Sequence, residues 1–353
     1  MSKHFRIILY VKIEFPFQLL KALVFGKQRP VPLIKALCYH LARKSDLNDL
    51  RVITDGLYAA SQLSIKDQEL MESLCGKAID LIKNSQQDLT SVIRSILTSL
   101  GQIGFLHKNL MDEITNWYVI KLKENQKILD RDLLNYVVTF AMLNYNPNSD
   151  QVFDTAIKQI QVDTLDTIKR PLYVWSLAVL EKVQDQHLAS VLNPDFASQI
   201  LCKVLKLQKT LRFCKTFSFT AKGSRNYGTT QKLLYINAVA KYLNTNYQGP
   251  LIELKDFALD EPSMAKSSQV KIILNALHAL ASPPNFLWEN VETLMGFKIT
   301  AEAVFDLEKV QPIGPIQEIA LLGKINEEKR PKNIPQKVPN FRSRIRKAKK
   351  FTT

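Results

Sequence analysis

Two glycines near the middle of the chain have the spacing of a phosphate-binding loop. Gly223 and Gly228 match the G-x-x-x-x-G-K-[ST] motif, whose backbone amides hold nucleotide phosphates. The next residue is Thr229, so the lysine that reaches the β- and γ-phosphates is missing. We therefore interpret residues 223–231 as a flexible basic loop in which Thr229 or Thr230 caps the following helix, and not as a nucleotide site.

Other side chains that could do chemistry do not form a recognisable motif. The five histidines are far apart, and no H-E-x-x-H, C-x-x-C or G-x-S-x-G occurs, so we expect no metal site and no cofactor. We also expect no small-molecule substrate. The glycine-rich loop, His-Arg-Asp and Asp-Phe-Gly motifs of protein kinases are missing as well. The sequence predicts a protein without catalysis.

One pair of carboxylates stands apart from this pattern. Glu302 and Asp306 are four residues apart in the alternating segment KITAEAVFDLE, which we expect to be a strand. On one strand they would lie on the same face and could mimic the site of a metal-dependent nuclease. The alternative is a solvated strand face.

Positive charge dominates the composition. The net charge is +15, and residues 324–353 contain eleven Lys or Arg against two acids. A basic tail with few apolar residues is expected to be disordered and to attract polyanions; the alternative is a role in solubility or targeting. Four of its cations are candidate RNA contacts, namely Arg342, Arg344, Arg346 and Lys347.

Two basic segments upstream are further RNA candidates. The first has cations near one face of a predicted helix: Lys203, Lys206, Lys209, Arg212 and Lys215. In the second, Lys222, Arg225 and Lys232 could neutralise phosphates while Tyr227 stacks on a base. The alternative for the first segment is a solvated helix face.

The elements that must position these residues are helices. Between residues 33 and 205 apolar residues recur at i, i+3, i+4 and i+7, and glycine is rare. Four segments align with separations of 40, 40 and 37 residues. The aligned positions hold a small residue at Ser61, Gly101, Ala141 and Ala178, followed two residues later by Leu63, Ile103, Leu143 and Leu180. This period predicts an α-solenoid of helical hairpins; the alternative is a non-repetitive bundle.

The rest of the sequence suggests a reducing compartment. The four cysteines have apolar neighbours and no short pairing, and no apolar run approaches the roughly 18 residues of a membrane span. The first residues, MSKHFRIILYVKI, are basic but poor in serine, so they only weakly match an organellar presequence.

From Lys222 onward the sequence resembles the FAST-kinase-domain protein family. The Ser-Arg element leading into LLYINAVAKYLNTNYQGPLI is similar to its leucine-rich module, which closes on Tyr-x-Gly-Pro, here Tyr247, Gly249 and Pro250. The helix SQVKIILNALHAL is similar to the next element of the family. The segment after it matches at Gly296, Ile299, Ala301, Glu302, Val304, Asp306 and Pro312.

The resemblance carries expectations for function. It implies octotricopeptide-like repeats, location in the mitochondrial matrix, and binding of single-stranded mitochondrial RNA, with other RNA-processing proteins as partners. It implies a role in the stability, processing or translation of transcripts. Family members end in a RAP domain, whereas here only IQEIALLGKINEEKRP resembles its start. We therefore expect that domain to be missing or truncated.

Together these patterns predict an all-α fold, in which a helical-hairpin solenoid precedes a mostly helical FAST-type region with a short β segment. The predicted divisions are 1–32 (N-terminal segment with weak presequence character), 33–205 (repeats), 206–260 (leucine-rich module), 261–323 (second FAST-type module with a truncated RAP-like start) and 324–353 (basic disordered tail). The predicted function is RNA binding in mitochondrial post-transcriptional control. Two alternatives are a helical scaffold for protein interactions and a remnant RAP/nuclease-like RNA-processing factor.

Overall fold

The structure is a computed structural model that describes residues 14–43, 48–85, 87–200, 222–244, 246–253, 268–280, 287–292, 298–303, 305–306 and 311–312. The chain divides into two compact units, Met1–Ala258 and Leu259–Thr353, and each is described here by itself. The predicted all-α class is confirmed, because helices make up most of the described residues.

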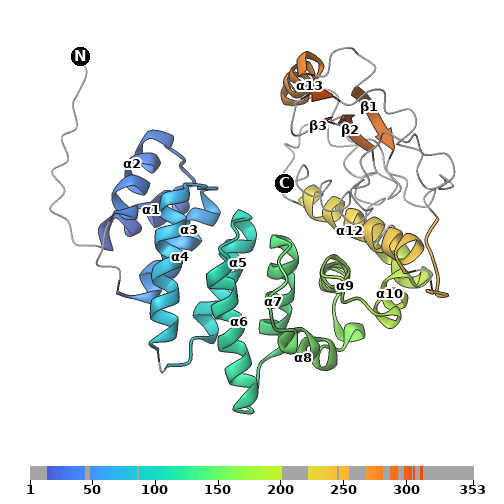
Figure 1. Cartoon of the computed structure of the whole chain (residues 1–353), viewed down its shortest axis with the longest axis horizontal. Helices are drawn as coiled ribbons and strands as arrows, with labels where there is room; N and C mark the ends of the chain where they lie inside the picture. Colours follow the sequence, from blue (N-terminus) through green and yellow to red (C-terminus); the bar gives the residue numbers. More distant parts are fainter. Residues whose placement is uncertain are drawn as a thin grey trace. The chain divides into compact units, whose positions relative to one another are not determined.

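The first unit consists of helices that follow one another in a row (Figure 1). A further helical stretch covers residues 194–200. In chain order the helices are α1 (Glu14–Phe25), α2 (Val31–Ala42), α3 (Leu50–Gln62), α4 (Gln68–Lys83), α5 (Thr90–Ile103), α6 (Lys108–Lys123), α7 (Asp130–Leu143), α8 (Gln151–Gln159), α9 (Lys169–Val179), α10 (Asp185–Leu192) and α12 (Lys222–Tyr242), with a short 3-10 turn at Val162–Thr164.

These helices pack in two layers. In the first layer α1, α3, α5, α7, α9 and α12 each contact the next, and in the second layer α2, α4, α6 and α8 do the same. From α1 to α9, neighbours within a layer are therefore alternate helices of the sequence, which is how stacked helical hairpins pack, whereas α10 lies between α9 and α12 in the sequence and contacts both. The predicted repeat architecture is confirmed.

The aligned repeat positions lie in the core between the layers. Leu63, Ile103, Leu143 and Leu180 are all buried. Three of the four small residues two positions earlier are buried, and Ser61 is half-buried. A methyl group added at Gly101 would lie 3.5 Å from Thr139 and Met142 of α7, so a larger side chain would hold α5 and α7 apart.

The first helix of the row, α1, docks on α3 by a close approach. A methyl group added at Gly56 would lie 2.5 Å from Cε1 of the buried Phe17. Lys21 also reaches across from α1, with its Nζ 2.6 Å from Oδ2 of Asp55. Because Gly56 has no side chain, the ring of Phe17 packs directly on the α3 backbone.

The structure corrects the prediction for residues 223–231. Since α12 begins at Lys222, these residues are helical and not a loop, and neither Thr229 nor Thr230 is the N-cap. Each glycine in a helix costs about 1 kcal/mol relative to alanine. Thr230, Leu233 and Leu234 are buried, however, and packing of this kind outweighs the propensity cost.

Hydrogen bonds within and after the Tyr-x-Gly-Pro motif stabilise the segment that follows α12. The Tyr247 hydroxyl donates to the carbonyl of Pro250 over 3.2 Å, and a methyl group at Gly249 would overlap that hydroxyl. Further along, the amide side chain of buried Asn237 donates to the carbonyl of Ile252 and accepts from its backbone N–H, both over 2.9 Å. The motif that carried the family resemblance therefore has a structural role here.

The second unit contains α13 (Ser268–Leu280) and short strands. β1 (Leu287–Glu292) pairs antiparallel with β2 (Lys298–Ala303), and β3 (Phe305–Asp306) pairs antiparallel with β4 (Gln311–Pro312). Glu302 lies in β2 and Asp306 in β3, so the prediction that they share one strand is wrong. The two strands take different partners, and a shared face of one continuous strand does not form.

Within the described residues, no helix combines the length and apolar character needed to cross a membrane.

Candidate nucleic-acid interface

Most residues predicted to contact RNA cannot be placed in this structure. Two groups lie outside the described residues: Lys203, Lys206, Lys209, Arg212 and Lys215, and Arg342, Arg344, Arg346 and Lys347. Lys222, Arg225 and Tyr227 lie in the first two turns of α12. Their role in RNA binding stays a prediction.

Lys232 is the predicted contact whose surroundings are described. Its Nζ donates to the carbonyl of Gly228 over 3.2 Å and lies 5.4 Å from the ring centroid of Trp175 on α9. Burial lowers the pKa of the Lys232 ammonium from its usual value. This cation is therefore held between α9 and α12 against an aromatic face, a contact of the cation–π type.

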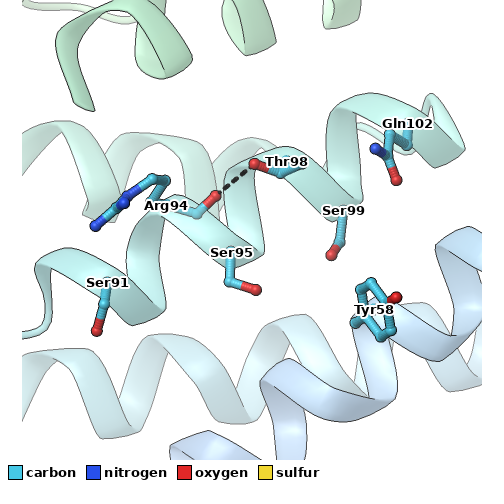
Figure 2. Close-up of a pocket in the computed structure, with 7 residues that line it drawn as sticks. All are labelled: Tyr58, Ser91, Arg94, Ser95, Thr98, Ser99 and Gln102. Carbon is cyan, nitrogen blue, oxygen red and sulfur yellow. Dashed lines mark hydrogen bonds between the residues drawn. The ribbon is translucent and has the colours of Figure 1, made fainter. Parts of the chain in front are cut away.

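A polar depression of about 340 Å³ lies over α3 and α5 of the first layer (Figure 2). It is open along one side. It is lined by Tyr58 from α3 and by Ser91, Arg94, Ser95, Thr98, Ser99 and Gln102 from α5.

Helix α5 contributes two polar rows to this depression. Residues four apart lie one turn from each other on the same side of a helix. One row is Ser91, Ser95 and Ser99, and the other is Arg94, Thr98 and Gln102. Four apolar residues of α5 are fully buried, namely Ile93, Ile96, Leu97 and Leu100. The apolar stripe docks the helix and leaves the polar side chains other than buried Ser99 accessible in the depression.

At one end the depression is bounded by an aromatic ring. Tyr58 is 40% exposed, and Figure 2 shows its ring beside Ser99. One helical turn further along α3, the amide of Gln62 donates to Oε1 of Gln102 over 3.2 Å. This hydrogen bond joins α3 to α5 and orients the side chain of Gln102.

The opposite edge is tied to α7. Thr98 Oγ1 donates to the carbonyl of Arg94 over 2.8 Å, as drawn in Figure 2, and Asn135 of α7 donates to the same carbonyl over 3.0 Å. The carbonyl therefore accepts one bond from within α5 and one from the next repeat, which fixes the position of Asn135 along the edge.

A buried carboxylate holds the arginine of the depression. Arg94 Nε lies 2.7 Å from Oδ1 of Asp132, which has no exposed surface, while the Arg94 side chain is 29% exposed. Arg131 Nε is also 4.0 Å from that oxygen. The Arg94–Asp132 atoms are not aligned as a hydrogen bond, and neither Asp132 oxygen has such a partner among the described residues. The attraction is therefore electrostatic, between a buried anion and a cation that reaches the surface.

The buried member of this pair, Asp132, lies near Tyr118 of α6. Burial raises the pKa of the Tyr118 phenol, and the nearby charge of Asp132 raises it further. The Tyr118 ring packs edge-on against Tyr136, with centroids 5.3 Å apart, and the Tyr136 hydroxyl is 2.9 Å from Thr115 Oγ1. This aromatic packing fills the space between α6 and α7 behind Asp132.

Sequence reasoning did not find this depression. The repeat alignment used the apolar and small positions of residues 97–105, whereas the signal for the depression is the four-residue spacing of polar residues from Ser91 to Gln102. Even with that signal, Tyr58 and Asp132 lie at least 30 residues from the α5 rows that they flank. Only the stacking of α3, α5 and α7 brings them there.

The described residues offer recognition chemistry at this place. Hydroxyl, amide, guanidinium and aromatic groups can hydrogen-bond and stack on a polar ligand. Within the described part of the chain, no group of three or more His, Cys, Asp or Glu side chains is placed to hold a metal ion.

Comparison with known proteins finds a matching family model and similar curated proteins. Residues 133–201 match the family model described as FAST kinase-like protein, subdomain 1. This range begins in α7 and ends before residue 206, where the sequence analysis placed the leucine-rich module. The boundaries of that module stay a prediction.

Curated relatives match over a longer range. FAST kinase domain-containing protein 4 from human (Homo sapiens) is 27% identical over 311 residues, which is 82% of this chain and 44% of the relative. The rat (Rattus norvegicus) and mouse (Mus musculus) proteins of the same name are 25% and 24% identical, each over 82% of this chain and 43% of the relative. The chain therefore spans less than half the length of the curated relatives it matches.

Proposed function

Since these matches support a protein of the FAST-kinase-domain family, we propose that it binds single-stranded RNA along the exposed side of the first layer. We place this activity in mitochondria, in control of the stability, processing or translation of mitochondrial transcripts, without catalysis. The mitochondrial location and the role rest on the family resemblance of the sequence.

The observation that carries RNA binding is the polar depression over α3 and α5. A solenoid presents an extended surface to an extended partner, and single-stranded RNA exposes base edges, ribose hydroxyls and phosphates along its length. Hydroxyl rows, the ring of Tyr58 and the guanidinium of Arg94 are complementary to these three kinds of group.

The charge of the chain favours the same partner. A net charge of +15 attracts a polyanion over a long range and accelerates its association. Lys232 of α12 beside Trp175 of α9, further along the first layer, is one of several places where a cation lies against an aromatic ring. Both observations support RNA over an uncharged peptide.

The test is the salt dependence of RNA binding by the full chain. Fluorescence anisotropy with a labelled single-stranded RNA of mixed sequence should show binding that weakens as salt rises, with a slope of about −0.7 for each phosphate neutralised. EDTA should leave the affinity and the length of the RNA unchanged. Lack of binding at low salt would contradict the proposal. Capture of a protein partner without RNA would instead favour a helical interaction scaffold, and metal-dependent cleavage would favour a nuclease.

A further inference from the structure

We propose that the depression over α3 and α5 is a subsite for one unpaired nucleotide of the bound RNA. The inference rests on the proposed function and makes it specific, because it assigns a base, a ribose edge and a phosphate to named side chains. The base stacks on Tyr58, the hydroxyl rows of α5 bind its polar edge or the ribose, and Arg94 binds a phosphate.

The shape of the depression favours a nucleotide within a strand over a free small molecule. Sites for small ligands are concave and bury most of the surface of the ligand. This depression holds about 340 Å³ but is open along one side. Its occupant must therefore be held by contacts elsewhere as well, as each nucleotide of a strand is held by its neighbours.

Tyr58 provides the stacking surface. Its ring is 40% exposed at one end of the depression, although the flanking Leu57 and Ala59 are fully buried. Their burial fixes this part of α3, so the ring is presented from a rigid backbone. A base stacks on such a ring whatever its sequence, because every base has a π-face.

The α5 rows provide polar contacts at the distance that a nucleotide needs. The hydroxyl of half-buried Ser95 can donate and accept, and it lies on the side of α5 that carries the row nearest Tyr58 in Figure 2, whereas Ser99 of the same row is buried. Arg94 lies at the other end of the depression in the same view. Four residues of helix correspond to about 6 Å, so Arg94 and Thr98 are separated by about the length of one nucleotide.

Asp132 determines how Arg94 acts. The buried carboxylate neutralises much of the guanidinium charge and fixes its Nε side at 2.7 Å. Arg94 therefore offers N–H donors in a fixed direction and adds little net charge. The subsite should contribute affinity that does not depend on salt, unlike the basic segments of the chain.

The experiment compares Tyr58→Leu with Tyr58→Phe in the full chain. Tyr58→Leu removes the ring and should weaken binding to a labelled single-stranded RNA about 5- to 100-fold. The slope of log affinity against log salt should stay as in the wild type, because no charge is removed. Tyr58→Phe keeps the ring and should lose far less affinity for the RNA than Tyr58→Leu does. Tyr39→Leu, at an exposed tyrosine of α2 outside the depression, is the matched control and should bind as the wild type does.

A second measurement locates the contact directly. Single-stranded RNA containing 4-thiouridine is photocrosslinked to the full chain, and the tryptic peptides are identified by mass spectrometry. Crosslinks are expected in two tryptic peptides. Peptide 52–66 contains Tyr58, and peptide 95–108 contains the second half of α5.

The outcomes separate the two proposals. Salt-dependent RNA binding that Tyr58→Leu leaves unchanged, or crosslinks confined to other peptides, would overturn the subsite and leave the proposed function standing. A wild-type chain that fails to bind RNA would overturn both. A ring-dependent loss with an unchanged salt slope and crosslinks in the two named peptides supports the subsite.

Discussion

Arg94 on α5 and Asp132 on α7 form an ion pair of unequal burial, with Nε and Oδ1 2.7 Å apart. The carboxylate has no exposed surface, whereas part of the guanidinium side chain reaches the polar depression. The pair therefore joins two neighbouring repeats and at the same time positions a side chain of the proposed RNA subsite.

The unequal burial predicts unequal effects of the two single substitutions. Arg94→Met leaves a buried carboxylate with only the largely exposed Arg131, whose Nε is 4.0 Å away, and should lower the free energy of unfolding by about 3 kcal/mol. Asp132→Leu should lower the free energy of unfolding by a smaller amount, because the Arg94 side chain can then extend into solvent. Urea denaturation measures both, and the double variant Arg94→Met/Asp132→Leu should be more stable than Arg94→Met alone. Equal losses in the two single variants would show that burial of the carboxylate is not the cause.

His187 makes the stability of α10 depend on pH. Its Nδ1 accepts the backbone N–H of Gln184 over 3.1 Å, and its ring lies edge-on to Tyr173 with centroids 6.2 Å apart. Burial lowers the pKa of this imidazole below its usual 6.5. The unfolded chain therefore takes up a proton at a higher pH than the folded chain, and stability is lost as the pH falls below about 6.5.

Comparison with His187→Gln isolates this effect from other titrating groups. Urea denaturation at a series of pH values gives the free energy of unfolding of both proteins. The difference in favour of the wild type should shrink as the pH falls from 8 to 5. A difference between the two proteins that stays constant over this range would refute the assignment to His187.

The close approach of the Tyr247 side chain requires a glycine at position 249. A methyl group there would overlap the Tyr247 hydroxyl, so Gly249→Ala should displace the ring and break its 3.2 Å hydrogen bond to Pro250. We expect a loss of about 1 kcal/mol in the free energy of unfolding. In a Tyr247→Ala background the same substitution should cost much less, and strict additivity in this double-mutant cycle would exclude the contact as the cause.

Gly56 tests the docking of α1 on α3. A methyl group at this position would lie 2.5 Å from the buried Phe17 ring, so Gly56→Ala should lower the free energy of unfolding by about 1 to 3 kcal/mol. Gly76→Ala is the control, because this glycine lies in α4 with no heavy atom within 4 Å of the added methyl group. Alanine there should be neutral or stabilising by up to about 1 kcal/mol. Thermal and urea unfolding distinguish the two, and equal effects would contradict the close approach.

Much of the fold could be predicted from the sequence, because burial along a helix depends on local spacing. The positions of Leu63, Ile103, Leu143 and Leu180 were predicted from periodicity alone, and all four are buried. The prediction from local spacing was wrong at residues 223–231, where two glycines indicated a loop and the structure has a helix. There the packing of Thr230 and Leu233 decides, and that packing depends on helices elsewhere in the chain.

The sequence by itself determined the helical period, the apolar stripe of each helix and the motif at Tyr247 to Pro250, because these depend on residues a few positions apart. Only the tertiary structure decided that Tyr58, Arg94 and Asp132 would meet at the α5 rows, since they come from three successive repeats. The physical reason is that the period sets which face of a helix is buried, whereas the stacking of helix on helix sets which exposed side chains become neighbours.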